Sequence, residues 1–97
     1  MGMKEVSAAL TAGDTASGWM EVARDTRVAI SVVGTFVASI TLQRQLINQD
    51  GTTETAASVE TWSSPIETTY MADQAQNVRL RATAYTSGTA NVRAGYG

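Results

Sequence analysis

The chain has 97 residues and a formal net charge of −2, which is the size of one domain with a weakly charged surface. It contains neither cysteine nor histidine. This excludes disulfides, thiolate nucleophiles and cysteine-ligated metals, and it removes the most common general base. The sequence therefore predicts a non-enzymatic protein with no cofactor and no metal.

Membrane and nucleic-acid partners are not predicted either. The longest apolar runs are far too short to cross a bilayer, and the N-terminus lacks the apolar segment of a signal peptide. Six arginines and one lysine are dispersed along the chain, whereas nucleic-acid binding needs a dense cationic face. We expect a soluble protein made in a cytoplasm.

The first 24 residues are weakly patterned. Lys4–Leu10 is a candidate first strand, and the Gly- and Thr-rich residues 11–18 indicate a loop. In residues 19–23 the side chains alternate, and Met20 and Val22 are the expected buried pair. We interpret residues 1–24 as an arm with the first strand or strands, ordered by a partner, and residues 25–97 as the body of a single domain.

Two strongly alternating segments follow. Thr26–Val33 turns Val28, Ile30 and Val32 to one face, and Phe36–Leu46 turns four apolar side chains inward: Phe36, Ala38, Ile40 and Leu42. Because only Gly34 and Thr35 separate the two segments, we predict that they form a hairpin.

The middle of the chain is less regular. Residues 48–58 are polar and carry the turn signal Asp50-Gly51, so we expect an exposed, mobile loop. Short extended segments are predicted at Val59–Trp62 and Ile66–Met71. Pro65 lies between them and disfavours a central strand position there.

The chain ends on two further alternating segments. Asn77–Tyr85 and residues 90–95 flank a Thr-Ser-Gly-Thr turn, which is typical of a hairpin. Five apolar side chains of these segments are expected to close the core: Val78, Leu80, Ala82, Ala84 and Val92. In total the pattern predicts an all-β domain, a small immunoglobulin-like or related β-sandwich of seven to eight short antiparallel strands.

Four carboxylates are weak candidates for a calcium site or for a catalytic acid/base pair. Asp50 and Glu54 flank a turn and are candidate calcium ligands, but calcium needs six to eight oxygens and the EF-hand spacing is missing. Glu60 and Glu67 have the residue type of a glycosidase acid/base pair, but nothing in the sequence sets their separation. A solvated loop and exposed strand positions explain these residues better.

Arginines and aromatic residues are better candidates for a functional site, and they predict a protein-binding surface. If the two terminal strands pair, Arg79, Arg81 and Arg93 lie near one another on one sheet surface, where their guanidinium groups suit partner carboxylates. The alternative is a solvated face. Trp19 and the outward Tyr85 are candidates for an interface, and Trp62 for packing between the sheets.

Two segments resemble small structural proteins of tailed bacteriophages. They are Gly34-Thr35-Phe36-Val37-Ala38-Ser39-Ile40-Thr41-Leu42-Gln43-Arg44 and the closing residues 78–93, which read VRLRATAYTSGTANVR. The resemblance covers about two-thirds of the chain, from Val28 to Tyr96. The loop between Arg44 and Trp62 is longer here than the compact Asp-Gly-Gly-x-x-Trp form of that pattern.

The resemblance implies a virion component without enzymatic activity. The expected role is a capsid decoration or cement protein that binds assembled coat subunits, so that its partner is the major capsid protein or another virion protein. A homo-oligomer is also compatible with the sequence. The alternative is a tail, adaptor or fibre-associated module that contacts host-surface glycans. The expected contacts are residues 1–10, the loop at 48–58 with Asp50, and the arginines.

Overall fold

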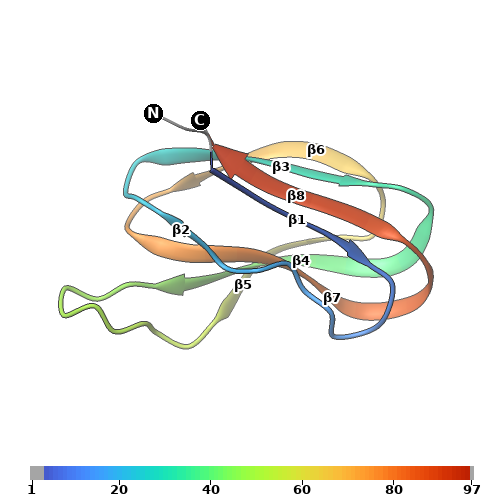
Figure 1. Cartoon of the computed structure of the whole chain (residues 1–97), viewed down its shortest axis with the longest axis horizontal. Helices are drawn as coiled ribbons and strands as arrows, with labels where there is room; N and C mark the ends of the chain where they lie inside the picture. The colour runs from blue at the N-terminus through green and yellow to red at the C-terminus, as the bar shows by residue number, and fades with distance from the viewer. Residues whose placement is uncertain (1–3, 97) are drawn as a thin grey trace.

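The structure, a computed structural model, describes residues 4–96, and within these residues all regular structure is β. Eight strands form two four-stranded antiparallel sheets packed face to face (Figure 1). The first sheet has the order β1-β8-β3-β6 and the second β2-β7-β4-β5. The strands are β1 (Lys4–Leu10), β2 (Met20–Val22), β3 (Thr26–Val33), β4 (Phe36–Leu46), β5 (Ala57–Trp62), β6 (Ile66–Ala72), β7 (Gln76–Gly88) and β8 (Ala90–Tyr96). The predicted all-β sandwich is confirmed.

The strand pairs are nested along the chain. β1 pairs with β8, β2 with β7, β3 with β6 and β4 with β5, so the chain is one long antiparallel ribbon whose far end is the β4–β5 hairpin. Two further pairings, β3 with β8 and β4 with β7, roll this ribbon into two sheets. This is the strand order of a jelly roll, a β-sandwich related to the immunoglobulin fold but built from two Greek keys.

Both predicted hairpins are wrong in their pairing. β3 and β4 lie in different sheets, and so do β7 and β8. The chain therefore crosses from one sheet to the other at Gly34-Thr35 and again at Thr89. Alternation could not reveal this, because two strands facing each other across a core show the same apolar period as two strands side by side in one sheet.

The two crossings are in contact. Thr89 N donates a hydrogen bond to the carbonyl oxygen of Thr35 at 2.9 Å. Gly34 has a φ of 109° and Gly88 a φ of 89°, which side chains rarely adopt. A Cβ on Gly34 would lie 2.5 Å from the Thr89 oxygen, and one on Gly88 would collide with Thr35 O. Glycine is therefore required at both turns.

The core lies between the sheets and contains the side chains predicted to face inward from most strands. Met20 and Val22 are buried, as predicted, and so are the three inward residues of β3. The core consists of Leu10, Met20, Val22, Val28, Ile30, Val32, Ile40, Leu42, Ala72, Val78, Leu80, Ala82, Ala90, Val92 and Ala94. Phe36, Ala38 and Trp62 are half-buried against it, so the predicted packing of Trp62 is confirmed.

Ala84 departs from the predicted core. The register between β4 and β7 shifts between Ser39 and Ile40, so that Ala84 pairs with Ser39 while Ala82 pairs with Ile40. Thr83 is the extra residue of this bulge, and it breaks the alternation along β7. Ala84 is consequently exposed.

A network of polar side chains lies at one end of the core and joins β4, β6 and β7. Arg44 donates a hydrogen bond to the hydroxyl of Tyr70 at 3.1 Å, and Tyr70 donates to Oε1 of Gln76 at 2.8 Å. Gln76 is fully buried, and its amide nitrogen donates to the carbonyl of Gln74 at 2.9 Å. The network matters because a buried amide without partners would destabilise the sandwich.

The N-terminal segment belongs to the sandwich. β1 pairs with β8 over seven residues, from Lys4 opposite Tyr96 to Leu10 opposite Ala90, and Leu10 is buried. The candidate first strand at residues 4–10 is therefore part of the first sheet, while the ordering of residues 1–24 by a partner stays a prediction. Met1–Met3 lie outside the described residues. Residues 4–96 contain no helix that is long and apolar enough to cross a membrane.

Candidate protein-binding surface

Three of the predicted site residues, Trp19, Arg79 and Arg81, lie together with two further polar residues on the outer face of the second sheet. The cluster consists of Asp14, Trp19, Gln43, Arg79 and Arg81, and we call it the β7 arginine surface. Arg79 and Arg81 are two residues apart on β7, so both point away from the core. Gln43 lies beside Arg79 because the β4–β7 register pairs these two residues.

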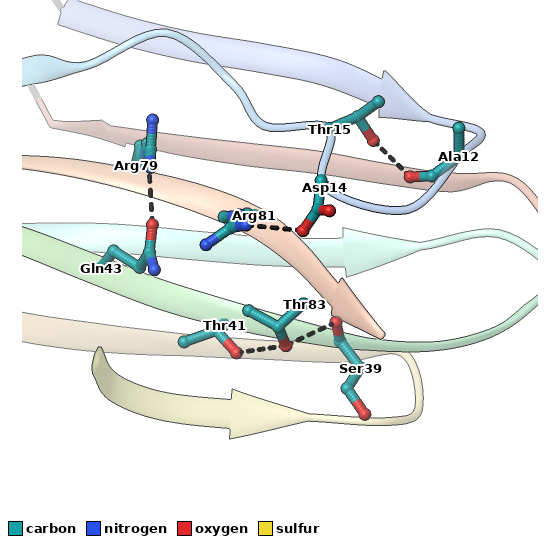
Figure 2. A network of polar contacts seen from close by, with 9 residues as sticks. All are labelled: Ala12, Asp14, Thr15, Ser39, Thr41, Gln43, Arg79, Arg81 and Thr83. Atoms are coloured by element: carbon teal, nitrogen blue, oxygen red, sulfur yellow. Dashed lines mark hydrogen bonds and ion pairs between the residues drawn. The ribbon is translucent and has the colours of Figure 1, made fainter. Parts of the chain in front are cut away.

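Arg79 is held from two sides. Its guanidinium carbon lies 4.3 Å from the centroid of the Trp19 ring, and its Nε donates a hydrogen bond to Oε1 of Gln43 at 2.9 Å. Figure 2 shows the rest of the guanidinium pointing away from Gln43. Partial burial, with the positive charge of Arg81 as a second cause, lowers the pKa of Arg79. A partner carboxylate would act against both effects, because an opposite charge favours the charged form of Arg79.

Arg81 is fixed by a loop. Its Nη2 lies 2.6 Å from Oδ1 of Asp14, which belongs to the connection between β1 and β2 (Figure 2). That connection runs alongside β7: Asp14 N donates to the Ala82 carbonyl at 3.0 Å, and Ala82 N donates to the Thr15 carbonyl at 2.8 Å. The loop therefore both covers the edge of β7 and supplies an internal carboxylate to Arg81.

A row of hydroxyl groups continues this face toward β5. Oγ1 of Thr41 lies 2.9 Å from Oγ1 of Thr61 and 2.9 Å from Oγ1 of Thr83. Thr83 donates to the carbonyl of Ser39 at 3.3 Å (Figure 2). Since each hydroxyl has one proton, Thr61 donates to Thr41, Thr41 donates to Thr83, and the Ser39 carbonyl accepts from Thr83. The row ties three strands together and needs no ligand.

Arg93 does not join the other two arginines. It lies on β8, in the first sheet, and its Nη1 is 3.3 Å from Oε2 of Glu5. The prediction of three neighbouring guanidinium groups is therefore wrong. It rested on pairing between β7 and β8, and those strands belong to opposite sheets.

Tyr85 and Asp50 lie away from the β7 arginine surface. The bulge places Tyr85 opposite Ala38, out of phase with Arg79 and Arg81, and its hydroxyl donates to the Gly88 carbonyl at 2.7 Å. Asp50 is at the far end of the β4–β5 hairpin, which extends beyond the sandwich (Figure 1). Both residues serve their own turns.

Sequence reasoning identified Trp19, Arg79 and Arg81 but not Asp14 and Gln43. The missing signal is tertiary. The neighbour of Gln43 depends on the β4–β7 register. Asp14 comes from a loop 67 residues away from Arg81. Residues 4–96 contain no group of three acidic side chains placed to hold a metal ion.

Comparison with known proteins adds no assignment: no protein-family model, no curated protein and no solved structure matches this chain.

Proposed function

We propose that the protein is a non-enzymatic structural component of a tailed-bacteriophage virion, a capsid decoration or cement protein that binds assembled coat subunits. It would be made in the host cytoplasm and act on the particle. The observation that supports this most directly is the β7 arginine surface, a preorganised cationic patch on the flat outer face of a jelly roll. The resemblance of residues 28–96 to phage structural proteins points the same way.

The fold agrees with this proposal without deciding it. Jelly rolls occur in viral capsid domains and in lectins, and one fold hosts many functions. The function must therefore be argued from the surface itself. A cement protein needs a rigid surface that recognises its partner, and both arginines lie on a central strand whose neighbours hold them in place.

The expected partner surface is acidic. Trp19 and Gln43 already fix the Arg79 side chain, so little conformational entropy remains to be lost when a carboxylate binds. Arginine suits such a partner because its planar group donates two parallel hydrogen bonds. We place these carboxylates on the major capsid protein or on another virion protein. Binding only to the assembled shell would stabilise that shell.

Shells that lack the protein provide the test. Purified protein is expected to rebind them stoichiometrically and to raise their melting temperature. Arg79→Gln and Arg81→Gln should each weaken binding by about 2–5 kcal/mol, the usual loss when one partner of a buried charge pair is removed. Arg24→Gln is the matched control, because Arg24 lies in the β2–β3 turn and is 76% exposed.

Two outcomes would contradict the proposal. The first is no binding to shells at any protein concentration. The second is binding that Arg79→Gln and Arg81→Gln leave unchanged although both variants keep the wild-type melting temperature. Either result would remove the β7 arginine surface from the proposed role.

A tail, adaptor or fibre-associated module that contacts host glycans is the second candidate. It is favoured by Trp19, an aromatic residue on the surface of a fold that lectins also use. However, Arg79 lies over the Trp19 ring, so a sugar would have to displace it or use the other side of the ring. A glycan array combined with a cell-binding assay distinguishes this candidate, because a cement protein binds neither.

A further inference from the structure

The outer face of the first sheet carries a second surface, unrelated to the β7 arginine surface. The strand registers place Ser7, Arg93, Ser31 and Glu67 side by side in one row across β1, β8, β3 and β6. The next row is Glu5, Gly95, Ala29 and Thr69. We call these eight residues, with Val33 and Met71 at the two ends, the β3 face.

The β3 face is low in the middle and apolar at its ends. A hollow of about 570 Å³ lies over Ser7, Ser31 and Arg93, and a second of about 310 Å³ continues from Ser31 to Glu67. Val33 at one end is 45% exposed and Met71 at the other is 48% exposed. Small residues in the middle allow another flat sheet to approach closely, and the exposed apolar side chains would gain from being covered.

The charges of this face are balanced and separated. Arg93 and Glu67 lie on either side of β3, about 10 Å apart at two strand spacings. Arg93 contacts Glu5 at 3.3 Å, but both side chains are well exposed, so this ion pair is weak and exchangeable. Among the described residues, Glu67 takes part in no ion pair.

We propose that the β3 face binds a second copy of the same chain. A two-fold axis that lies in the interface and runs along β3 through Ser31 exchanges the two sides of the row. It places Arg93 of each copy opposite Glu67 of the other, and it brings the two Val33 side chains together. The contact is self-complementary, as a two-fold dimer requires, and aligned sheets pack in this way in β-sandwiches.

The size of the face predicts a weak, reversible dimer. Across this axis β8, β3 and β6 have counterparts in the other copy, whereas β1 extends beyond the edge strand β6. Three strands at about 4.8 Å by seven residues at about 3.4 Å give on the order of 340 Å² per copy, below the usual range for stable interfaces. Like charges approach at two places. Glu67 of each copy comes near Glu5 of the other, with Arg93 between the two carboxylates. The two Arg27 side chains, four residues from Ser31 along β3, also face each other. Aligned sheets diverge by about 30°, which moves this pair toward the solvent-exposed rim.

Charge reversal provides the test. Sedimentation equilibrium over increasing concentration is expected to show the mass of the wild type rising from 10.2 kDa toward twice that value. Arg93→Glu and Glu67→Arg should each remain monomeric at concentrations where the wild type dimerises, because each variant places like charges opposite each other twice. An equimolar mixture of the two variants restores both pairs and should dimerise again.

The mixture also reports on folding, since a misfolded variant could not restore association. Arg24→Glu, in the β2–β3 turn, is the control reversal and should leave dimerisation unchanged. A monomeric wild type at all concentrations, dimers that survive both single reversals, or a mixture that stays monomeric would each overturn the proposal. The assay uses the isolated protein, so its result is independent of binding to shells.

Discussion

At the scale of single residues, Asp50 shows how a candidate ligand is used by its own turn. Its Oδ1 accepts hydrogen bonds from Thr52 N at 3.0 Å and from Thr52 Oγ1 at 2.6 Å. Asn48 in turn donates from its side-chain nitrogen to Thr52 Oγ1 at 3.1 Å. The segment predicted to be a mobile loop is therefore a hairpin end with its own hydrogen bonds, and Asp50 is committed to it.

These hydrogen bonds predict how the hairpin end responds to pH. The Thr52 hydroxyl, followed by the Thr52 amide, lowers the pKa of Asp50 from its ordinary value of 3.8. Because the folded pKa is the lower one, the carboxylate stabilises the turn above about pH 3.8 and this contribution is lost as pH falls through the lowered pKa. In an NMR titration the Thr52 amide resonance should shift with a midpoint below 3.8.

Asp50→Asn is the control for this titration. The variant lacks the titrating group, so the acid shift of the Thr52 amide should disappear while the dispersion of core resonances is retained. A midpoint at or above 3.8 in the wild type would show that the carboxylate is not held by Thr52.

At the scale of the elements, the crossings at Gly34-Thr35 and at Thr89 are the shortest connections between the two sheets within residues 4–96. Gly34 and Gly88 have positive φ, and each turn contacts the other through its backbone. The crossings also set which strands become neighbours, because β3 and β4 leave the turn into different sheets. The glycines thus contribute to topology as well as to local geometry.

Gly88→Ala is expected to destabilise the fold by more than about 1 kcal/mol, since alanine is strained at this φ and its Cβ would collide with the backbone of Thr35. The free energy of unfolding in urea measures the effect. Gly18→Ala is the matched control, because no heavy atom lies within 4 Å of a Cβ placed there. Equal stability of the two variants would contradict the requirement for glycine at the crossing.

At the scale of the whole molecule, nested pairing makes almost every strand contact long in sequence. β1 at residues 4–10 pairs with β8 at residues 90–96, so the two ends of the chain must meet before the first sheet is complete. Among the strands of residues 4–96, β4 and β5 are the one consecutive pair that is hydrogen-bonded. Loop closure must therefore precede most of the stabilising contacts.

Slow folding follows from this topology. Domains dominated by non-local β pairing fold in about milliseconds to seconds, whereas helical bundles of this size fold in microseconds to milliseconds. Stopped-flow refolding from urea, followed by tryptophan fluorescence, should place this chain in the slower range. Complete refolding within about 100 microseconds would show that long-range pairing does not limit the rate.

Much of the secondary structure could be predicted from the sequence. The bounds of β1, β3 and β4 agree with the predicted segments, and Met20 and Val22 are buried as expected. These predictions succeed because a strand with one face against a core must alternate, and alternation is visible in one dimension. The prediction that Ala84 belongs to the core was wrong, because the bulge at Thr83 interrupts the alternation along β7.

The candidate site was predictable only in part. Trp19, Arg79 and Arg81 were identified as outward or interfacial residues, and the structure brings them together. Arg93 was assigned to the same surface because the turn before it suggested a hairpin. Which strands pair is a long-range property, and the sequence pattern of a turn within one sheet is the same as that of a crossing between two sheets.

The sequence by itself determined the class of the fold and the faces of most strands, since both depend on local period and turn residues. Only the tertiary structure decided the jelly-roll strand order, and with it the sheet on which each of the three arginines lies. Arg79 and Arg81 stayed together on β7, while the crossing at Thr89 moved Arg93 to the opposite sheet. The physical reason is that alternation records burial, whereas pairing depends on how the whole ribbon rolls around its core.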